Sequence, residues 1–452
     1  MSKNIIILSD GTGQEGGRGR DTNVYKLFRM LEDRTERQTV FYDQGIGTDS
    51  RRVLGNIAGA GFSENLLQCY QFIYENYQAG DKIFLFGFSR GAATVRSLAN
   101  FIHYFGILPR SRPKLIKLAY KIYKVGIEER DTGDGAHLKS IPEESAPQEL
   151  TQRGMESLVE LRDAVIRGTP LNQQAEQFVH SHPNQWAAID FLGVWDTVPA
   201  LGFPGAVIDT FVNYVPGWKH RYHDFNLHPS VQNAYHALSI DDDRKWFHPT
   251  IWDSYNKDYQ KVEQVWFSGS HTDVGGGFRE PGLSDITLEW MVQKAVAHGL
   301  KLYLRATKYW NFCIAPDATD VYHPPRVGVG RAYPARQRYW PETAIKTIGV
   351  PKIHASVLER AKHVEGYNPW ILKEFSELEI EPWVENFEYE GTEMSIRDYD
   401  EPTWQDRFEF DGNKINIMRP ENHYDNLLKR GELSGGRLKR DLSRWRARQI
   451  AK

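Results

Sequence analysis

Residues 81–93 read Asp-Lys-Ile-Phe-Leu-Phe-Gly-Phe-Ser-Arg-Gly-Ala-Ala, and this stretch decides the expected fold. Its first half is a short apolar run, typical of a strand buried on both faces of a parallel sheet. Gly87 to Gly91 form a G-x-S-x-G motif, and the small residues after it favour a helix. A serine on a sharp strand-to-helix turn needs glycine at the flanking positions, where a Cβ would collide with neighbouring backbone. The stretch therefore predicts that Ser89 is a nucleophile; the alternative is a tight structural turn with a buried serine.

Four more apolar runs are separated from this stretch by helical patterns. With Lys82–Phe86, the expected strands are Asn4–Leu8, Gln38–Tyr42, Ala188–Trp195 and Val262–Phe267. Apolar residues recur at helical spacing in Phe62–Tyr77 and Asp285–His298. This alternation predicts an α/β fold, with a doubly wound, mostly parallel sheet of five or more strands and right-handed crossovers.

Two stretches interrupt this alternation, and the pattern changes again toward the C-terminus. Residues 110–187 are long, polar and partly helical, and residues 203–228 hold apolar and aromatic side chains among several histidines. We expect both as insertions at the carboxyl edge of the sheet, the second as a lid or acyl-chain wall, or as plain packing. Residues 1–330 are thus predicted to form the catalytic domain, and residues 331–452 an irregular C-terminal extension packed on it. The basic end of this extension, Arg437–Lys452, is expected to be a solvated helix or to touch an anionic membrane.

The composition excludes several classes of protein. The chain has 452 residues, of which 40% are hydrophobic and 25% charged, as in globular proteins. Its 56 basic and 59 acidic residues give a net charge of −3, which provides no overall attraction for nucleic acid. Two cysteines, Cys69 and Cys313, are too few for a disulfide framework. No apolar run reaches the ~18–20 residues of a membrane span and no signal peptide is evident, so we expect a cytoplasmic protein unless a signal-independent route exports it.

A nucleophilic serine needs a histidine as base and an acid that orients this histidine. Around a G-x-S-x-G turn of this type the chain order is serine, acid, histidine, and ligands bind at the carboxyl ends of the strands. The last two expected strands are followed by Asp196 and by a loop with His271. We therefore predict Ser89, Asp196 and His271 as the catalytic residues. Asp273, otherwise a turn residue, is the alternative acid, and His236, whose helical neighbours favour a packed role, is the alternative base.

The negative charge that develops on the attacked carbonyl oxygen needs hydrogen-bond donors. The backbone N–H of Arg90 lies at the start of the helix after Ser89 and is one expected donor. The loop after the first strand contains Asp10, Gly11 and Thr12, and the backbone of Gly11 or Thr12 is expected to supply the second donor. Asp10 is then expected to organise this loop.

The same loop also matches a dinucleotide-binding fingerprint. Gly11, Gly13 and Gly16 have the G-x-G-x-x-G spacing, and Asp43 follows the second strand as a ribose-binding acid would. The acidic Asp10 beside the pyrophosphate position and the lack of a helix start at Gly16 count against this interpretation. The sequence signal for a metal site is weak as well, because the histidine and aspartate pairs lack a third ligand at a set spacing. We expect neither a cofactor nor a metal.

Taken together, these landmarks resemble one known family, the α/β-hydrolase family DUF2235, which includes phospholipase effectors of bacterial type VI secretion. The matching segments are Asp10–Thr12, Thr22–Val24, Tyr42–Thr48, Gly87–Ala92, Gly193–Val198, Tyr235–Asp241 with Arg244, Gly269–Gly277 and Ile353–Arg360. The chain departs from the family pattern after Thr12, where Gly13 and Gln14 replace a bulky residue and an asparagine, and in a longer loop through Arg20.

The resemblance implies an α/β-hydrolase fold and a serine hydrolase that uses Ser89, Asp196 and His271. Its substrates would be carboxylic esters, often phospholipids, and a membrane surface would be a further partner. Two alternatives stay open. One is a standalone cytoplasmic esterase or thioesterase that acts on small or non-lipid acyl groups. The other is a non-catalytic α/β module that binds a partner or a nucleotide.

Overall fold

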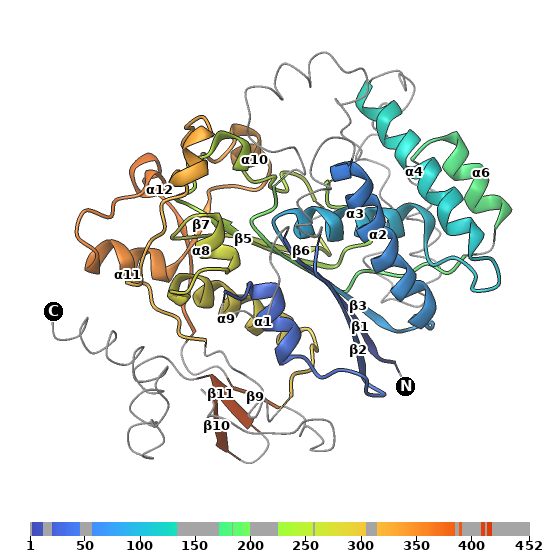
Figure 1. Cartoon of the computed structure of the whole chain (residues 1–452), viewed down its shortest axis with the longest axis horizontal. Coiled ribbons are helices and arrows are strands. Elements are labelled where there is room, and N and C mark those ends of the chain that lie inside the picture. The colour runs from blue at the N-terminus through green and yellow to red at the C-terminus, as the bar shows by residue number, and fades with distance from the viewer. Residues whose placement is uncertain are drawn as a thin grey trace.

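The computed structural model describes residues 2–11, 20–45, 57–132, 171–182, 184–198, 225–255, 258–303, 314–384, 388–390, 408–411 and 414–417, which Figure 1 draws in colour. Several sequence predictions lie outside the described residues. These are Thr12, parts of both expected insertions (133–170 and 203–224) and the basic segment at 437–452.

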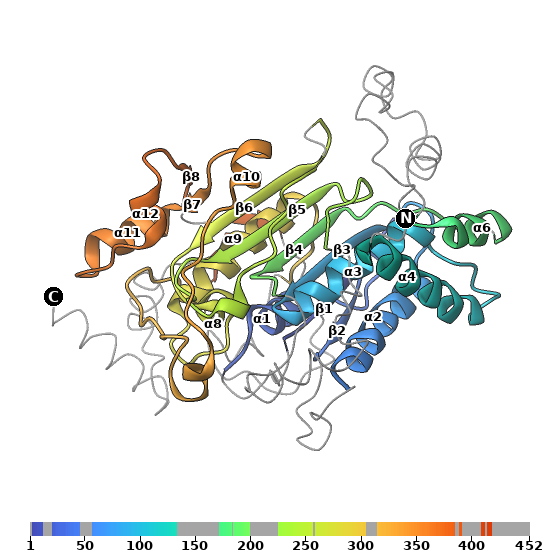
Figure 2. The same ribbon diagram turned by 90° about the horizontal axis from the view of Figure 1, so that it is seen from above.

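One large parallel sheet organises the described part of the chain. Eight strands follow the order β2-β1-β3-β4-β5-β6-β7-β8, which Figure 2 shows from one edge to the other, and every neighbouring pair is parallel. The strands are β1 (Asn4–Ser9), β2 (Gln38–Asp43), β3 (Lys82–Phe88), β4 (Phe191–Trp195), β5 (Asn233–Ser239), β6 (Lys261–Phe267), β7 (Lys352–His354) and β8 (Glu379–Glu381). All residues of β1 and β4 are buried, which explains their unbroken apolar runs.

Helices cover both faces of this sheet, because parallel strands need crossover connections (Figure 1). Those before β4 are α1 (Asn23–Met30), α2 (Ile57–Asn76), α3 (Arg90–Phe105), α4 (Lys114–Thr132) and α6 (Gln173–Ser181). Those after β6 are α8 (His271–Gly275), α9 (Gly282–Ala297), α10 (Glu342–Thr347), α11 (Ala355–His363) and α12 (Trp370–Glu374). Two short 3-10 helices, Lys245–Phe247 and Gly328–Ala332, lie in loops. A separate antiparallel sheet has the order β10-β11-β9, from β9 (Glu388–Glu390), β10 (Phe408–Asp411) and β11 (Lys414–Ile417).

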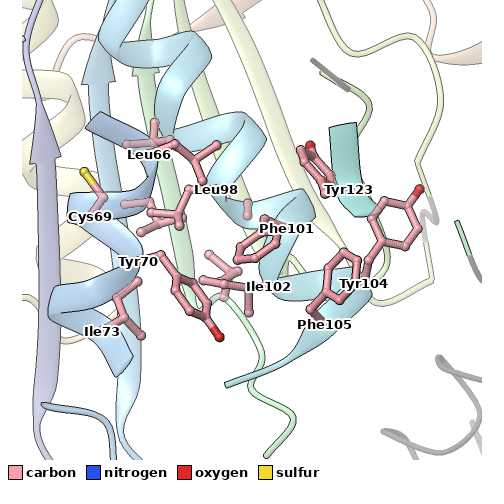
Figure 3. Close-up of a cluster of buried hydrophobic side chains, with 14 of the residues drawn as sticks. Leu66, Cys69, Tyr70, Ile73, Leu98, Phe101, Ile102, Tyr104, Phe105 and Tyr123 are labelled. Atoms are coloured by element: carbon pink, nitrogen blue, oxygen red, sulfur yellow. The ribbon is translucent and has the colours of Figure 1, made fainter. Parts of the chain in front are cut away.

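Each face of the large sheet has its own hydrophobic core. Side chains of α2, α3 and α4 form the first, and Figure 3 shows its centre, where Tyr70 and Phe101 meet edge to face with ring centroids 4.8 Å apart. The buried hydroxyl of Tyr70 is satisfied, since it donates to Gly106 O (2.9 Å) and accepts from Leu108 N–H (3.0 Å). Side chains of α1 and α9 form the core on the opposite face. The central strands are therefore fixed from both sides, and so are the positions at which they end.

The doubly wound, mostly parallel sheet that the sequence predicts is confirmed. All five expected strands are present, and the two expected helices correspond to α2 and α9. The helical setting expected around His236 is wrong, because this residue lies in the middle of β5. The sheet also continues past residue 330, since β7 and β8 extend it. These two strands have three residues each, too few for a periodic pattern.

Among the described residues, no helix is both long enough and apolar enough to cross a membrane.

Candidate active site

Ser89 lies on a sharp turn between β3 and α3. Its backbone has φ 57° and ψ −117°, in a region that side-chain-bearing residues rarely adopt. The turn is tight on both sides: a Cβ on Gly87 would lie 2.5 Å from Gly91 O, and one on Gly91 would lie 2.0 Å from Ser9 O. The Ser89 N–H donates to Trp195 O (3.1 Å), which ties the turn to the end of β4. The two glycines of the motif thus allow the close backbone contacts that hold the serine in place.

Ser89, His271 and Asp196 form one continuous line of hydrogen bonds. The distance from Ser89 Oγ to His271 Nε2 is 2.8 Å, and that from His271 Nδ1 to Asp196 Oδ2 is 2.5 Å. The three residues follow β3, β4 and β6, so all three stand at the carboxyl edge of the sheet. They are separated by up to 182 positions in the sequence, and the parallel strand order brings their side chains together.

The imidazole of His271 is held by a short helix and by two aromatic rings. His271 is the first residue of α8, whose start is closed by a capping box between Ser270 and Asp273. Its ring contacts those of Phe88 and Phe247, at centroid distances of 4.7 and 5.1 Å, and only 4% of the residue is exposed. This packing leaves the ring little freedom to leave the line.

Asp196 is fully buried and accepts four hydrogen bonds. Oδ2 accepts from His271 and from Arg338 Nη2 (2.8 Å), and Oδ1 accepts from Arg338 Nη1 (2.6 Å) and from Ser239 N–H (3.0 Å). Burial alone would raise the pKa of this carboxyl group, but the charge and hydrogen bonds of Arg338, together with His271, hold the pKa of Asp196 well below its usual range. The carboxylate is therefore ionised at any pH at which the protein would work.

Arg338 is the contact that the sequence analysis missed. It lies 142 positions after Asp196, in an irregular segment where its neighbours Arg336, Gln337 and Tyr339 are exposed. An arginine among exposed polar residues has the pattern of a surface residue. No motif or spacing in the sequence distinguishes it from the basic residues around it.

Asp273, the alternative acid, and His236, the alternative base, form hydrogen bonds outside the line from Ser89 to Asp196. Asp273 accepts from Ser270 and from His323 Nδ1 (2.7 Å), so it caps α8. His236 is fully buried in β5 and accepts from Thr197 N–H (3.1 Å). Burial, reinforced by the nearby Arg96 cation, lowers the pKa of His236 to about 3. The sequence analysis offered two roles for each of these residues. The contacts of Asp273 are those of a turn residue, and the contacts of His236 are those of a packed histidine.

The loop after β1 is organised by Asp10. This buried carboxyl group accepts from Gly11 N–H (2.7 Å), Thr22 Oγ1 (2.6 Å) and the Tyr42 hydroxyl (2.7 Å). Burial raises the pKa of Asp10 to about 7, although these hydrogen bonds act in the opposite direction. Since the Gly11 N–H already donates to Asp10, it would have to leave this partner to serve as an oxyanion donor. The N–H of Arg90, the first residue of α3, stays a predicted donor.

Asp43 has a structural contact of its own. Its carboxylate accepts from Ser9 Oγ (2.8 Å) and Gly45 N–H (3.1 Å), which joins the ends of β1 and β2. In the part of the chain that the structure describes, no three His, Cys, Asp or Glu side chains gather closely enough to hold a metal ion.

A rim of aromatic and cationic side chains borders Ser89 and His271; it consists of Arg90, Arg244, Trp246, Phe247 and Tyr333. The Tyr333 ring contacts Phe247 and Trp246, at centroid distances of 5.3 and 5.6 Å, and the Arg244 guanidinium lies 3.5 Å from the centre of the Phe247 ring. Burial lowers the pKa of Arg90 to about 10, whereas a Tyr333 phenolate would raise it. Among the described residues the Arg90 guanidinium has no hydrogen bond or ion pair.

Comparison with known proteins identifies the family. Residues 3–294 match the family described as T6SS, phospholipase effector Tle1-like, catalytic domain. The chain belongs to this family. The resemblance inferred from the sequence motifs is thereby confirmed.

The individual proteins that resemble this chain match only part of it, or match it at low sequence identity. An uncharacterized protein of Saccharomyces cerevisiae, YEL023C, is 32% identical over 139 residues, which are 27% of this chain and 20% of that protein. Among solved structures, an uncharacterized protein from Pseudomonas aeruginosa has a TM-score of 0.33 at 15% identity, over 67% of this chain and 46% of its own. The Tle1 effector bound to the VgrG spike of the type 6 secretion system has a TM-score of 0.29 at 17% identity, over 62% of this chain and 52% of its own. The chain thus spans a fifth of the yeast relative and about half of the two solved structures.

Proposed function

We propose that this protein is a serine hydrolase that cleaves carboxylic esters of lipids through Ser89, His271 and Asp196. The observation that carries the proposal is the unbroken line from the Ser89 hydroxyl through the imidazole to a buried carboxylate. A serine of ordinary basicity becomes a nucleophile when an adjacent base can take its proton and a third group orients that base. Both conditions are met at the carboxyl edge of the sheet.

The reaction proceeds in two halves. Ser89 Oγ attacks the acyl carbonyl, and its proton moves to His271 Nε2. The resulting imidazolium then protonates the leaving alcohol as the ester bond breaks, so an acyl-enzyme on Ser89 remains. In the second half, a water gives its proton to His271 and attacks the acyl carbonyl. The acid is released, and the serine recovers its proton.

The negative oxygen formed in each half needs donors that already point at it. The N–H of Arg90 stands at the open end of α3, beside the serine, and is the donor that we assign. One such donor contributes about 10²–10³ in kcat.

Lipid esters are the substrate class that we favour, for two reasons. The family is described as one of phospholipase effectors. In addition, the Arg90 guanidinium, which has no hydrogen bond or ion pair among the described residues, stands directly after the nucleophile, beside aromatic side chains of the rim. An arginine in this position binds a phosphate oxygen well, since its planar fork matches phosphate geometry, while aromatic rings accept the apolar glycerol and acyl carbons.

A fluorophosphonate probe tests the nucleophile directly. The wild-type protein should be labelled and Ser89→Ala should not, because the probe phosphonylates an activated serine. Ser97→Ala is the control: Ser97 is a buried serine of α3, two turns after Ser89, and among the described residues its hydroxyl has no hydrogen-bond partner. It should label like wild type. Labelling that persists in Ser89→Ala would refute the assignment of the nucleophile.

A substrate panel tests the class of ester. Phospholipid vesicles, short-chain p-nitrophenyl esters and acyl thioesters are incubated with wild type, and Ser89→Ala is the blank. Release of fatty acid from the vesicles is the expected result. Turnover of only the short esters or thioesters would leave a serine esterase but exclude the lipid substrate. A complete lack of labelling and turnover would favour a non-catalytic module.

A further inference from the structure

Arg338 is a buried cation all of whose donors are used. The residue is 1% exposed, and its five N–H groups make five hydrogen bonds. Two go to the Asp196 carboxylate, and the other three go to the carbonyl oxygens of Ser239 (2.6 Å), Phe247 (2.8 Å) and Asp242 (3.1 Å). Ser239 is the last residue of β5 and the other two carbonyls follow it, so the guanidinium is fixed to this edge of the sheet with its fork toward Asp196.

The segment that carries Arg338 is itself held at the active site. Lys245 N–H donates to Pro334 O (2.9 Å), and Arg336 N–H donates to Asp243 O (2.7 Å). The Trp340 indole donates to Gly349 O (2.9 Å). The family match ends at residue 294, so this segment comes from outside the matched region. A part of the chain beyond the family domain thus completes the surroundings of the acid.

The other titratable groups that face Asp196 do not supply a counter-charge of this kind. Burial lowers the pKa of His236 to about 3 and that of His248 to about 4, so both rings are neutral above about pH 5. Asp242 is a carboxylate paired with Arg244 (2.5 Å), and Asp241 accepts from Gly269 N–H and the Tyr367 hydroxyl. Arg244 is therefore engaged with Asp242, whereas Arg338 is bound to Asp196 itself.

We propose that Arg338 is a positioning residue for the hydrolysis proposed above. Arg338 keeps Asp196 ionised and fixes the orientation of the Asp196 oxygens toward His271. This contact has two effects. The fork holds both oxygens in one plane, so Oδ2 stays on Nδ1 and the imidazole keeps Nε2 toward Ser89. The positive charge of Arg338 also partly offsets the negative charge of Asp196, so it limits how strongly this carboxylate attracts a positive imidazolium.

The pH dependence of probe labelling separates this role from simple packing. The second-order rate constant for fluorophosphonate labelling is measured from pH 5 to 9 in wild type, Arg338→Met and Arg338→Lys. In Arg338→Met the Asp196 carboxylate has no counter-charge and stabilises the imidazolium more strongly. The acid limb of the profile, where the labelling rate falls as the pH is lowered, should therefore move upward by about one pH unit. The plateau, which is the maximal rate constant, should fall at least about tenfold. Arg338→Lys keeps the charge without the fork. Its plateau should also fall, while its acid limb stays at the wild-type pH.

Arg360 offers a matched control. It is also a buried arginine from the C-terminal part of the chain, 4% exposed, but it donates to the carbonyls of Ala318 and Asp320, away from the line. Arg360→Met should leave the acid limb in place, whatever it does to thermal stability. An unmoved limb in Arg338→Met, or an equal shift in Arg360→Met, would overturn the proposal. If Arg338→Met does not fold, Arg338→Lys alone tests the proposal. An upward shift of the acid limb in Arg338→Lys, which retains the positive charge, would contradict the proposed role of Arg338.

A second readout is independent of catalysis. In a Ser89→Ala background, the proton between His271 Nδ1 and Asp196 Oδ2 is followed by its far-downfield proton NMR resonance during a pH titration. The midpoint should be higher when Arg338→Met is added, and unchanged when Arg338→Lys is added. Failure of wild type to react with the probe would refute the proposed hydrolase function, while the NMR titration would still decide the role of Arg338.

Discussion

Ser89 and Arg90 are adjacent in sequence, yet they are assigned different tasks. Ser89 supplies the hydroxyl of the line. In the reaction that we propose, Arg90 would offer its backbone N–H to the reacting oxygen and its guanidinium to the rest of the substrate. A substitution that removes only the side chain separates these two tasks of Arg90, because the backbone donor remains.

Arg90→Gln is therefore expected to act selectively. Activity on anionic phospholipid vesicles should fall about tenfold or more, because a hydrogen bond to a charged group contributes about 1.5–3 kcal/mol. Activity on a neutral short-chain ester should stay within about twofold, since such a substrate has no phosphate to bind. The measurement is kcat/KM on both substrates, with Lys362→Gln on α11, an exposed site far along the chain, as the control. Equal losses on both substrates would speak against a phosphate contact.

At the level of elements, α8 packs closely against the end of β3. A Cβ on Gly275 would lie 2.0 Å from Cε2 of the Phe88 ring, so only glycine fits at this position of α8. Phe88 also contacts the His271 ring. The position of the imidazole thus depends on a close approach between a helix and the strand that leads to the nucleophile.

Gly275→Ala should move α8 away from β3 and carry His271 with it. A displacement of about 1 Å in a catalytic group can lower a rate about 100-fold, so we expect a loss of this order in probe labelling. The double variant Gly275→Ala/Phe88→Leu removes the rigid ring and should recover part of the loss. Gly366→Ala serves as the control: the positive φ of Gly366 (77°) should cost some thermal stability, but no atom lies near its would-be Cβ, so labelling should stay as in wild type. Wild-type labelling of Gly275→Ala would show that α8 adapts without cost.

The three residues that the structure brings into one hydrogen-bonded line each have a local signal in the sequence. Ser89 is marked by the glycines around it, and Asp196 and His271 by their places after buried strands. β5 was missed because its centre, Tyr235 to Leu238, mixes alanine and leucine with a buried histidine, and these residue types do not favour a strand. Arg338 could not be found, because its meaning comes from a contact across 142 positions and not from its neighbours.

At the scale of the whole molecule, the large sheet does not end where the sequence pattern changes. A third hydrophobic cluster joins Leu238, Ile240 and Trp266, from the ends of β5 and β6, to residues beyond position 330. The partners from that region are Trp340, Ala344, Ile353, Val357, Trp370 and Ile371. The predicted division at residue 330 would therefore cut through a core.

A chain ending at residue 330 tests this division. It would expose Trp266, which is fully buried in the full chain, and it would lose β7, β8 and Arg338. We expect it to aggregate or to unfold without cooperativity, because an exposed apolar face of this size is a site of association. Size-exclusion chromatography and thermal unfolding provide the measurement, with the 452-residue chain as reference. A soluble, cooperatively folded chain that still reacts with the probe would support residues 1–330 as an independent domain.

Two members of the line have backbones with positive φ, Ser89 at 57° and Asp196 at 40°. Such conformations cost about 1–3 kcal/mol each in residues other than glycine. At position 89 the protein therefore retains a serine where backbone conformation alone would favour glycine, whereas the strain at Asp196 is offset by its ion pair with the buried Arg338. In descendants that no longer need the hydroxyl, drift toward glycine at position 89 would therefore make the fold more resistant to heat, whereas glycine at position 196 would leave the Arg338 cation buried without its carboxylate.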